Sequence, residues 1–310
     1  LSRLFAEWMR HIEARGRSPH TLERNRRTIV QVFSPLADRS ITEVTTRDLD
    51  GLYDELLARG LSPASVRRHH AVIAAAYSQA ERWGWIEPGR SPTARVTIPE
   101  SPKKSLVVPK PREIQRIVSA LQEMNPTYAM AAFLAAATGA RRGELCALRW
   151  CDYREGVLDI SESLYRVNGE TGTKQTKTGR QRLVPVVGSA QAALAAWHQR
   201  CVDLAAEVDL ELQPDAYILS SWPDGTRPLN PDSLSSAFSR TAKALGLGHV
   251  HLHSLRHFAA TEMLAAGVSP KDTADVLGHA NPTMTLNVYA HSTAERKRAA
   301  LEAIDRALGP

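Results

Sequence analysis

Cysteine and long apolar runs are both scarce in this chain of 310 residues, and each absence narrows its class. The three cysteines, Cys146, Cys151 and Cys201, have no metal-type spacing, and an odd number without a signal peptide is typical of reduced thiols. The opening stretch LSRLFAEWMRHIEARGRS lacks the apolar centre of a secretory signal. No apolar run approaches the about 20 residues that a membrane span needs. We therefore expect a soluble protein of the cytoplasm with no membrane partner.

Several enzyme classes are excluded by motifs that the sequence does not contain. It has no Gly-rich phosphate loop and no dinucleotide-binding fingerprint. Its C-terminal half has no cluster of Asp and Glu of the kind that a magnesium-dependent nuclease needs. The three His of HLHSLRH have no carboxylate or Cys at metal-ligand spacing, and Arg256 among them would repel a cation. We therefore expect neither a metal nor a nucleotide cofactor.

The charge balance is basic, with 39 Lys and Arg against 33 Asp and Glu and a net charge of +6. Such a balance favours a polyanionic partner, with nucleic acid as the leading candidate. Every Lys or Arg before about residue 96 is Arg, whose planar donors bind two phosphate oxygens at once. The candidate DNA contacts are Arg26, Arg27, Arg67, Arg68, Lys103 and Lys104. A solvated helical face and an ordinary linker stay open as the alternatives for these residues.

Hydrophobic periodicity predicts two domains, at residues 1–96 and 111–310, joined by a Pro-rich linker at residues 97–110. The first domain reads as all-helical, and two of its helices open at Ser-Pro pairs. The second predicts further helices and a small antiparallel sheet, with strand character at Val157 to Ile160 and in TKTGRQRLVPV. The predicted fold class is thus mainly α with a small antiparallel β-sheet: an all-helical domain followed by an α+β domain.

Two places in the second domain put cations beside strongly apolar sequence. Arg141 follows an Ala-rich helix and its Gly stop, where an unpaired guanidinium is costly, so it needs an anion. Glu144 or a ligand could supply that anion. His253 and Arg256 are three residues apart and therefore share one face of a helix.

Two further places supply residues that transfer protons. Lys177 lies at the tip of the expected TKTG hairpin, and His279 and Tyr289 lie in LGHANPTMTLNVYAH. Taken alone, a Tyr on a short helix is usually a packing residue. Cations together with a Tyr and no metal are nevertheless what attack on a phosphodiester requires. Fixed donors stabilise the transition-state charge by about 3 kcal/mol each, and a Lys can protonate the leaving oxygen.

The motifs TGARRGEL, HSLRH, LGH and VYAH, in this order and with Lys177 in a hairpin between the first two, resemble those of the tyrosine recombinases of the phage-integrase family. Any one of them occurs often by chance, whereas all of them in this order are a specific signal that covers essentially the whole chain. The resemblance implies that residues 1–96 are a DNA-clamping core-binding domain. It implies that residues 111–310 are the catalytic domain.

The resemblance also implies a role for each candidate catalytic residue. Arg141 and Arg256 correspond to the arginines that clamp the scissile phosphate, and Lys177 to the lysine that protonates the leaving 5′ oxygen. His253 corresponds to the residue that assists deprotonation of Tyr289, the nucleophile that forms a 3′-phosphotyrosyl link. This link conserves the phosphodiester energy, so the resemblance implies no metal and no cofactor.

Three more residues complete this expected site. His279 corresponds to the donor that stabilises the pentacoordinate phosphorus. Glu144 matches the acidic residue of the first motif and is interpreted as orienting, and His257 as structural.

The implied assembly is a homotetramer on two double-stranded DNA core sites, with DNA-bending or excision factors as candidate further partners. The apolar stripe Leu301, Ile304 and Leu308 favours docking of the last helix on a neighbouring subunit, with folding back onto its own domain as the alternative. The first residue is Leu rather than Met, which leaves open whether an arm-binding domain precedes it.

The outcome of the reaction has several alternatives. The TKTGRQRLVPV hairpin and the NPTMTLNVYAH ending favour the integrase of a phage or other mobile element. A Xer-type recombinase that resolves chromosome dimers or plasmids is the main alternative. A type IB topoisomerase and a DNA-binding protein without catalysis also stay open.

Overall fold

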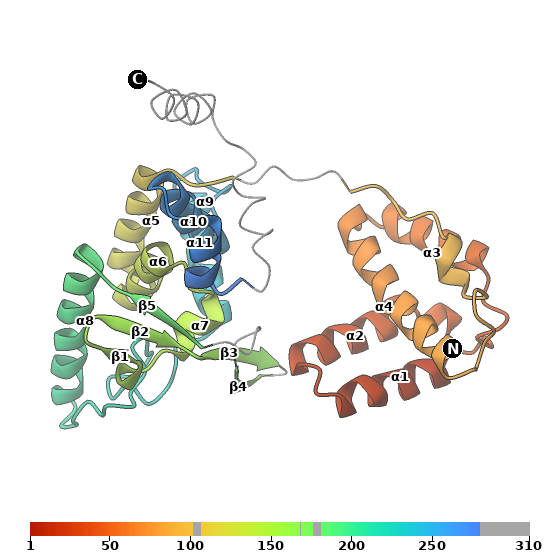
Figure 1. Ribbon diagram of the computed structural model, residues 1–310, viewed down its shortest axis with the longest axis horizontal. Helices are drawn as coiled ribbons and strands as arrows, with labels where there is room; N and C mark the ends of the chain where they lie inside the picture. The colour runs from red at the N-terminus through yellow and green to blue at the C-terminus, as the bar shows by residue number, and fades with distance from the viewer. Residues whose placement is uncertain (102–106, 168, 176–180, 280–310) are drawn as a thin grey trace, which may run out of the picture. The chain divides into compact units, whose positions relative to one another are not determined.

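A computed structural model describes residues 1–101, 107–167, 169–175 and 181–279 (Figure 1). The chain divides into two compact units, Leu1–Ser105 and Leu106–Pro310. Each unit encloses a hydrophobic core of its own. The expected tip of the TKTG hairpin, the ending NPTMTLNVYAH and the last helix with its apolar stripe lie outside the described residues.

The first unit is helical throughout its described part, as the sequence predicts. Its elements are α1 (Ser2–Ala14), α2 (Pro19–Val32), the 3-10 turn η1 (Ser34–Leu36), α3 (Thr46–Ala58), α4 (Pro63–Arg82) and the 3-10 turn η2 (Pro92–Arg95). The Ser-Pro pairs open α2 and α4, because the hydroxyls of Ser18 and Ser62 each accept a backbone N–H of the first turn. Tyr53, Tyr77 and Phe33 are almost fully buried in the core between these helices.

The second unit packs its helices around a buried central one. These helices are α5 (Pro111–Met124), α6 (Pro126–Thr138), α7 (Arg142–Ala147), the 3-10 turn η3 (Trp150–Asp152), α8 (Ser189–Ala206), α9 (Pro231–Ala244), α10 (Leu252–Ala265) and α11 (Pro270–Leu277). Helix α6, the Ala-rich helix that the sequence predicts to be buried, contacts α5, α8, α9 and α10. In the described part of the chain, no helix is both long enough and apolar enough to pass through a bilayer.

The strands of the second unit form two small antiparallel sheets (Figure 1). One has the order β1-β2-β5, from β1 (Tyr153–Arg154), β2 (Val157–Ile160) and β5 (Arg182–Pro185). The other pairs β3 (Glu162–Val167) with β4 (Glu170–Gln175). The predicted fold class, mainly α with a small antiparallel sheet, is confirmed. The sequence analysis did not predict the β3–β4 ribbon, because its residues are mostly polar and partly exposed and show little of the apolar alternation used to find strands.

Candidate active site

The ends of α6 and α11 meet closely beside α10 in the second unit. Gly139, which follows α6, has a φ of 64°, and a side-chain Cβ built on it would lie 2.3 Å from Leu277 Cδ2 and 3.3 Å from Ala259 Cβ. Glycine is the residue that adopts this left-handed conformation without a steric penalty. Only a residue without a side chain therefore lets α6 approach α10 and α11 in this way.

A second left-handed glycine ends α11. Gly278 has a φ of 67°, and the backbone N–H of His279 donates a hydrogen bond to Ala274 O at 2.8 Å. This is the usual way in which a left-handed glycine closes a helix C-terminus. The arrangement fixes the backbone of His279 at the end of α11.

Arg141 lies at the start of α7 and binds both a carboxylate and a helix end. Its Nη1 donates to Glu144 Oε1 at 2.7 Å, and its Nη2 donates to Gly278 O at 2.7 Å. Its backbone N–H donates to Glu144 Oε2 at 2.8 Å, which closes a capping box on α7. The anion that the sequence requires beside Arg141 is therefore Glu144, which is 1% exposed.

Arg256, on α10, is 3% exposed and is held by backbone carbonyls. Its Nη1 donates to Gly139 O at 2.6 Å and its Nη2 to Leu277 O at 2.5 Å. Burial, followed by the charge of Arg141, lowers the pKa of Arg256 to about 9, although Glu144 acts in the opposite direction. Arg256 thus remains a cation at neutral pH.

A third arginine, Arg182, belongs to the same cluster and was missed by the sequence analysis. It begins β5, its Nε donates to Val276 O at 2.9 Å, and its Nη2 donates to Glu144 Oε2 at 2.5 Å. A signal for its burial exists in the sequence. Arg182 alternates with Val184 along β5, and strand alternation places both on the buried face.

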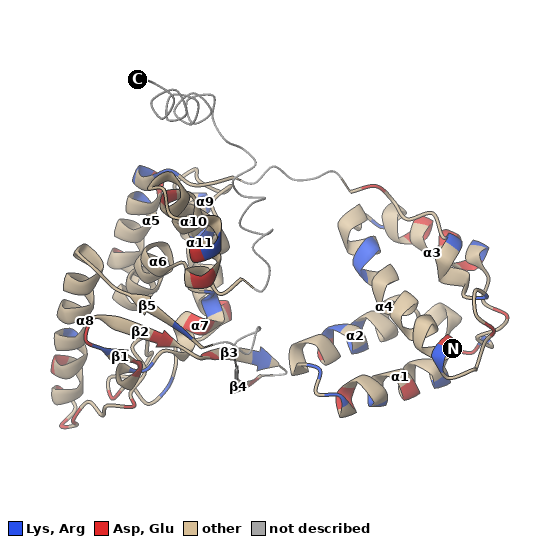
Figure 2. Cartoon of the chain, in the orientation of Figure 1, with Lys and Arg blue, Asp and Glu red and all other residues tan. Residues whose placement is uncertain are grey.

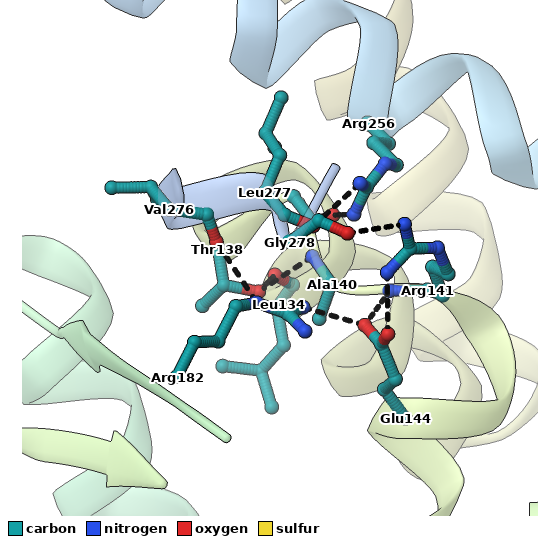
Figure 3. Close-up of polar contacts among 11 residues, drawn as sticks. Leu134, Thr138, Ala140, Arg141, Glu144, Arg182, Arg256, Val276, Leu277 and Gly278 are labelled. Carbon is teal, nitrogen blue, oxygen red and sulfur yellow. Dashed lines mark hydrogen bonds and ion pairs between the residues drawn. The ribbon is translucent and has the colours of Figure 1, made fainter. Parts of the chain in front are cut away.

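Three arginines thus donate hydrogen bonds to three consecutive carbonyl groups at the end of α11 (Figure 3). Over residues 276–278, Arg182 donates to the first carbonyl, Arg256 to the second and Arg141 to the third. The last carbonyls of a helix have no partner within it and carry partial negative charge, so they suit guanidinium donors. Within this cluster, Glu144 is the carboxylate that pairs with Arg141 and Arg182.

Three imidazoles lie within the field of these arginines. His253 and His257 are one turn apart on α10, with ring centroids 4.9 Å apart and planes at 83°. Burial, followed by the charges of Arg256 and Arg141, lowers the pKa of His253 and lowers the pKa of His279 to about 4. Burial, followed by His253 and Arg256, lowers the pKa of His257 to about 4. These imidazoles are therefore neutral at pH 7 and each can both donate and accept a hydrogen bond.

The structure brings together the candidate residues Arg141, Glu144, His253, Arg256, His257 and His279. Lys177 and Tyr289 lie outside the described residues, as do Lys103 and Lys104. Among the described residues, no group of three or more His, Cys, Asp or Glu could hold a metal ion. The arrangement combines cationic donors with neutral imidazoles, which suits the binding and activation of a phosphate group.

The candidate DNA contacts of the first unit differ in their surroundings. Arg26 and Arg27, on α2, both contact the Glu23 carboxylate, at 3.4 and 2.7 Å. Arg67 donates to Pro99 O at 3.4 Å. Arg68 instead lines a cleft of about 510 Å³ formed by α1, α2 and α4.

This cleft is strongly cationic (Figure 2 shows the basic residues of these helices). The arginines that line it are Arg15, Arg17, Arg24, Arg68 and Arg82, and no carboxylate is among its lining residues. Four of the five were not selected from the sequence. They are widely spaced along the chain, and only the packing of three helices brings them to one surface.

Comparison with known proteins identifies the family. The model described as "Phage integrase family" matches residues 109–296, and the model described as "Phage integrase, N-terminal SAM-like domain" matches residues 5–84. The chain belongs to the phage integrase family. It is therefore a tyrosine recombinase, an enzyme of the class that cleaves and rejoins DNA strands in site-specific recombination. The family resemblance predicted from the motifs is confirmed.

Similar proteins include both Xer-type recombinases and integrases. Tyrosine recombinase XerC of Xanthomonas campestris pv. campestris (strain B100) is 29% identical over 280 residues, which cover 88% of this chain and 79% of the relative. The Tn1549 transposon integrase, solved in complex with transposon right end DNA, has a TM-score of 0.79 and 24% identity and covers 98% of this chain and 99% of that chain. A lambda integrase tetramer bound to a Holliday junction has a TM-score of 0.69 and 21% identity and covers 92% of this chain and 76% of that chain.

Proposed function

We propose that this tyrosine recombinase is the integrase of a mobile element, such as a phage, and that it cuts and rejoins double-stranded DNA at recombination core sites through Tyr289. The observation that carries the proposal is the convergence of Arg141, His253, Arg256 and His279 from separate segments onto the end of α11. Two of these residues are cations and two are neutral imidazoles. Together they match the electrostatic needs of a phosphorane-like transition state.

The proposed chemical step is a transfer of a phosphodiester from a 5′ oxygen to a phenol. The Tyr289 oxygen attacks phosphorus while its proton passes to the neutral imidazole of His253, whose low pKa leaves it free to accept one. The bond between phosphorus and the 5′ oxygen breaks, and Lys177 protonates that oxygen. The product is a 3′-phosphotyrosyl link, and the reverse of the step joins a new 5′ hydroxyl. No metal or cofactor enters this step.

The arginines stabilise the charge that develops on the non-bridging oxygens. Arg141, whose side chain is 26% exposed, is open to a phosphate oxygen while it stays paired with Glu144. Arg256 is almost covered, so we infer that it reaches the phosphate by exchanging the Leu277 carbonyl for a phosphate oxygen. His279 donates an N–H to the same group. Each such donor contributes about 3 kcal/mol toward the transition state.

The first unit is proposed to clamp the DNA beside the cleaved bond. We assign residues 1–96 as the core-binding domain, residues 97–110 as the linker and residues 111–310 as the catalytic domain. The arginine-lined cleft between α1, α2 and α4 supports this role, because arginine binds phosphate oxygens in a bidentate way. We further propose a homotetramer on two duplexes, by analogy with the lambda integrase complex, and DNA-bending or excision factors as additional partners.

The covalent intermediate provides the decisive test. Wild-type protein incubated with a nicked core site should form an adduct stable to denaturation, because the nicked strand diffuses away and prevents religation. Tyr289→Phe should bind the same DNA but form no adduct, since it lacks the attacking oxygen. Binding without an adduct from the wild-type protein would favour a DNA-binding protein without catalysis. Relaxation of supercoils without exchange between two sites would favour a topoisomerase.

A Xer-type recombinase is the second candidate, because the curated relatives with this name are 29% identical to the chain. The hairpin TKTGRQRLVPV and the ending NPTMTLNVYAH support the integrase instead. Sequencing the DNA joined to trapped protein separates the two candidates. Junctions at the ends of a mobile element support an integrase, whereas a resolution site of the chromosome or of a plasmid supports a Xer-type enzyme.

A further inference from the structure

We propose that Arg182 is a positioning residue for strand cleavage, which holds Glu144 from the side opposite Arg141 and so keeps the Arg141 guanidinium available to the phosphate. The proposal rests on the proposed function, because it assigns Arg141 to the scissile phosphate. It concerns Arg182 of the stretch TKTGRQRLVPV, a residue to which the sequence alone assigned no role.

The contacts of Arg182 enclose its guanidinium within the protein. Its Nε and Nη2 donate to Val276 O and Glu144 Oε2. Its Nη1 packs against Gly278, where a side-chain Cβ would lie only 2.9 Å from this nitrogen and 3.2 Å from Arg182 Cζ. A side chain that is 7% exposed and is packed against α7 and the end of α11 is placed to support its neighbours rather than to bind DNA.

The charge of Arg182 acts mainly on the Glu144 carboxylate. Burial alone would raise the pKa of Glu144, but the hydrogen bond and charge of Arg182, followed by those of Arg141, hold it below its usual value. The charges of Arg256 and Arg141 lower the pKa values of His253 and His279. The main electrostatic partner of Arg182 in this cluster is instead the Glu144 carboxylate, which it helps to keep ionised.

The hydrogen bonds of Glu144 show what Arg182 prevents. Oε1 accepts from Arg141 Nη1, and Oε2 accepts from the Arg141 backbone N–H and from Arg182 Nη2. A carboxylate and a guanidinium frequently pair through two parallel hydrogen bonds. Without Arg182, we expect Arg141 to adopt this bidentate pairing, which would withdraw its Nη2 from Gly278 O and from the phosphate.

The test compares single-turnover adduct formation on a nicked core site among four forms of the full chain: wild type, Arg182→Met, Glu144→Gln and the double variant. Arg182→Met should slow adduct formation about a hundredfold, the size expected when a catalytic group is misplaced. Affinity for the DNA should change by less than about threefold, because the other phosphate contacts remain. In the Glu144→Gln background, where no carboxylate competes for Arg141, the same substitution should cost less than about threefold.

Two further variants separate positioning from a loss of structure. Arg154→Met makes the same change at an exposed arginine of the same sheet, on β1, and should leave the rate within about twofold of the wild type. Arg182→Lys retains the charge with fewer hydrogen bonds and should recover at least about tenfold of the loss.

An equal slowing by Arg182→Met with and without Glu144→Gln would overturn the proposal, and so would a rate close to the wild type. If Arg182→Met does not fold, the comparison of Glu144→Gln with the double variant decides: similar rates support the proposal, and a further large loss contradicts it. Absence of an adduct from the wild-type protein would instead contradict the proposed function.

Discussion

Replacing Gly139 with Ala tests the close approach of α6 and α11 on which the arginine cluster depends. The left-handed backbone at Gly139, with a φ of 64°, costs an Ala about 1–2 kcal/mol. The new Cβ would also lie 2.3 Å from Leu277 Cδ2, and such overpacking costs about 1–3 kcal/mol more. We expect the free energy of unfolding of the second unit to fall by about 2–5 kcal/mol.

Gly246→Ala is the matched control for this substitution. Gly246, just after α9, has a φ of 74°, but nothing lies within 4 Å of a Cβ built there. This variant should therefore lose only the backbone contribution of about 1–2 kcal/mol. The difference between the two variants isolates the contact with Leu277. Urea unfolding measures both, with the two units treated as separate transitions where they do not unfold together.

The same pair of variants links the packing to the chemistry. The Leu277 carbonyl holds Arg256, so a displaced Leu277 should slow adduct formation at least about tenfold in Gly139→Ala. Gly246→Ala should cleave at nearly the wild-type rate. Equal unfolding free energies for the two variants, with unchanged cleavage in both, would refute the reasoning that this contact positions the clamp.

Two further predictions concern pH and salt. The pKa of His257 is about 4 in the folded protein against an ordinary 6.5, so the unfolded chain binds the proton more tightly. The contribution of this residue to the free energy of unfolding should therefore be complete above about pH 6.5 and should decrease as the pH falls toward 4. His257→Asn should lessen this fall in a series of thermal unfolding midpoints, and an identical fall would assign it to other groups. Arg24→Ala with Arg68→Ala should reduce the slope of log affinity against log salt by about 2, one for each lost phosphate contact. Replacing both Arg26 and Arg27 with Ala should change this slope less, because both contact Glu23. A larger change from this pair than from Arg24 and Arg68 would assign the DNA contact to the exposed face of α2 rather than to the cleft.

Local sequence signals predicted the features that depend on residues close together in the chain. The Ser-Pro pairs fix the starts of α2 and α4 because the cap and the first turn are adjacent. The need of Arg141 for an anion was predicted in the same way, and Glu144, one of the two candidates left open, supplies it from a three-residue spacing at a helix start.

Two features that depend on distant segments were not predicted. Arg182 reaches Glu144 across 38 positions of sequence and Val276 across 94. The cleft arginines gather only when α1, α2 and α4 pack together. The spacing of motifs along the chain carries no information on which distant residues come into contact, so it assigned no role to Arg182.

At the end of α11, Arg141 and Arg256 each donate one hydrogen bond to a peptide carbonyl, that of Gly278 and that of Leu277, and this has a consequence for how the enzyme meets its substrate. A neutral carbonyl releases a guanidinium at lower electrostatic cost than a carboxylate does, so these two donors can pass to phosphate oxygens while Arg141 stays paired with Glu144. These carbonyls belong to the turn that leads directly into His279. A phosphate that draws the guanidinium groups away also loosens that turn, and we expect arrival of the DNA and final adjustment of this histidine to occur as a single coupled event.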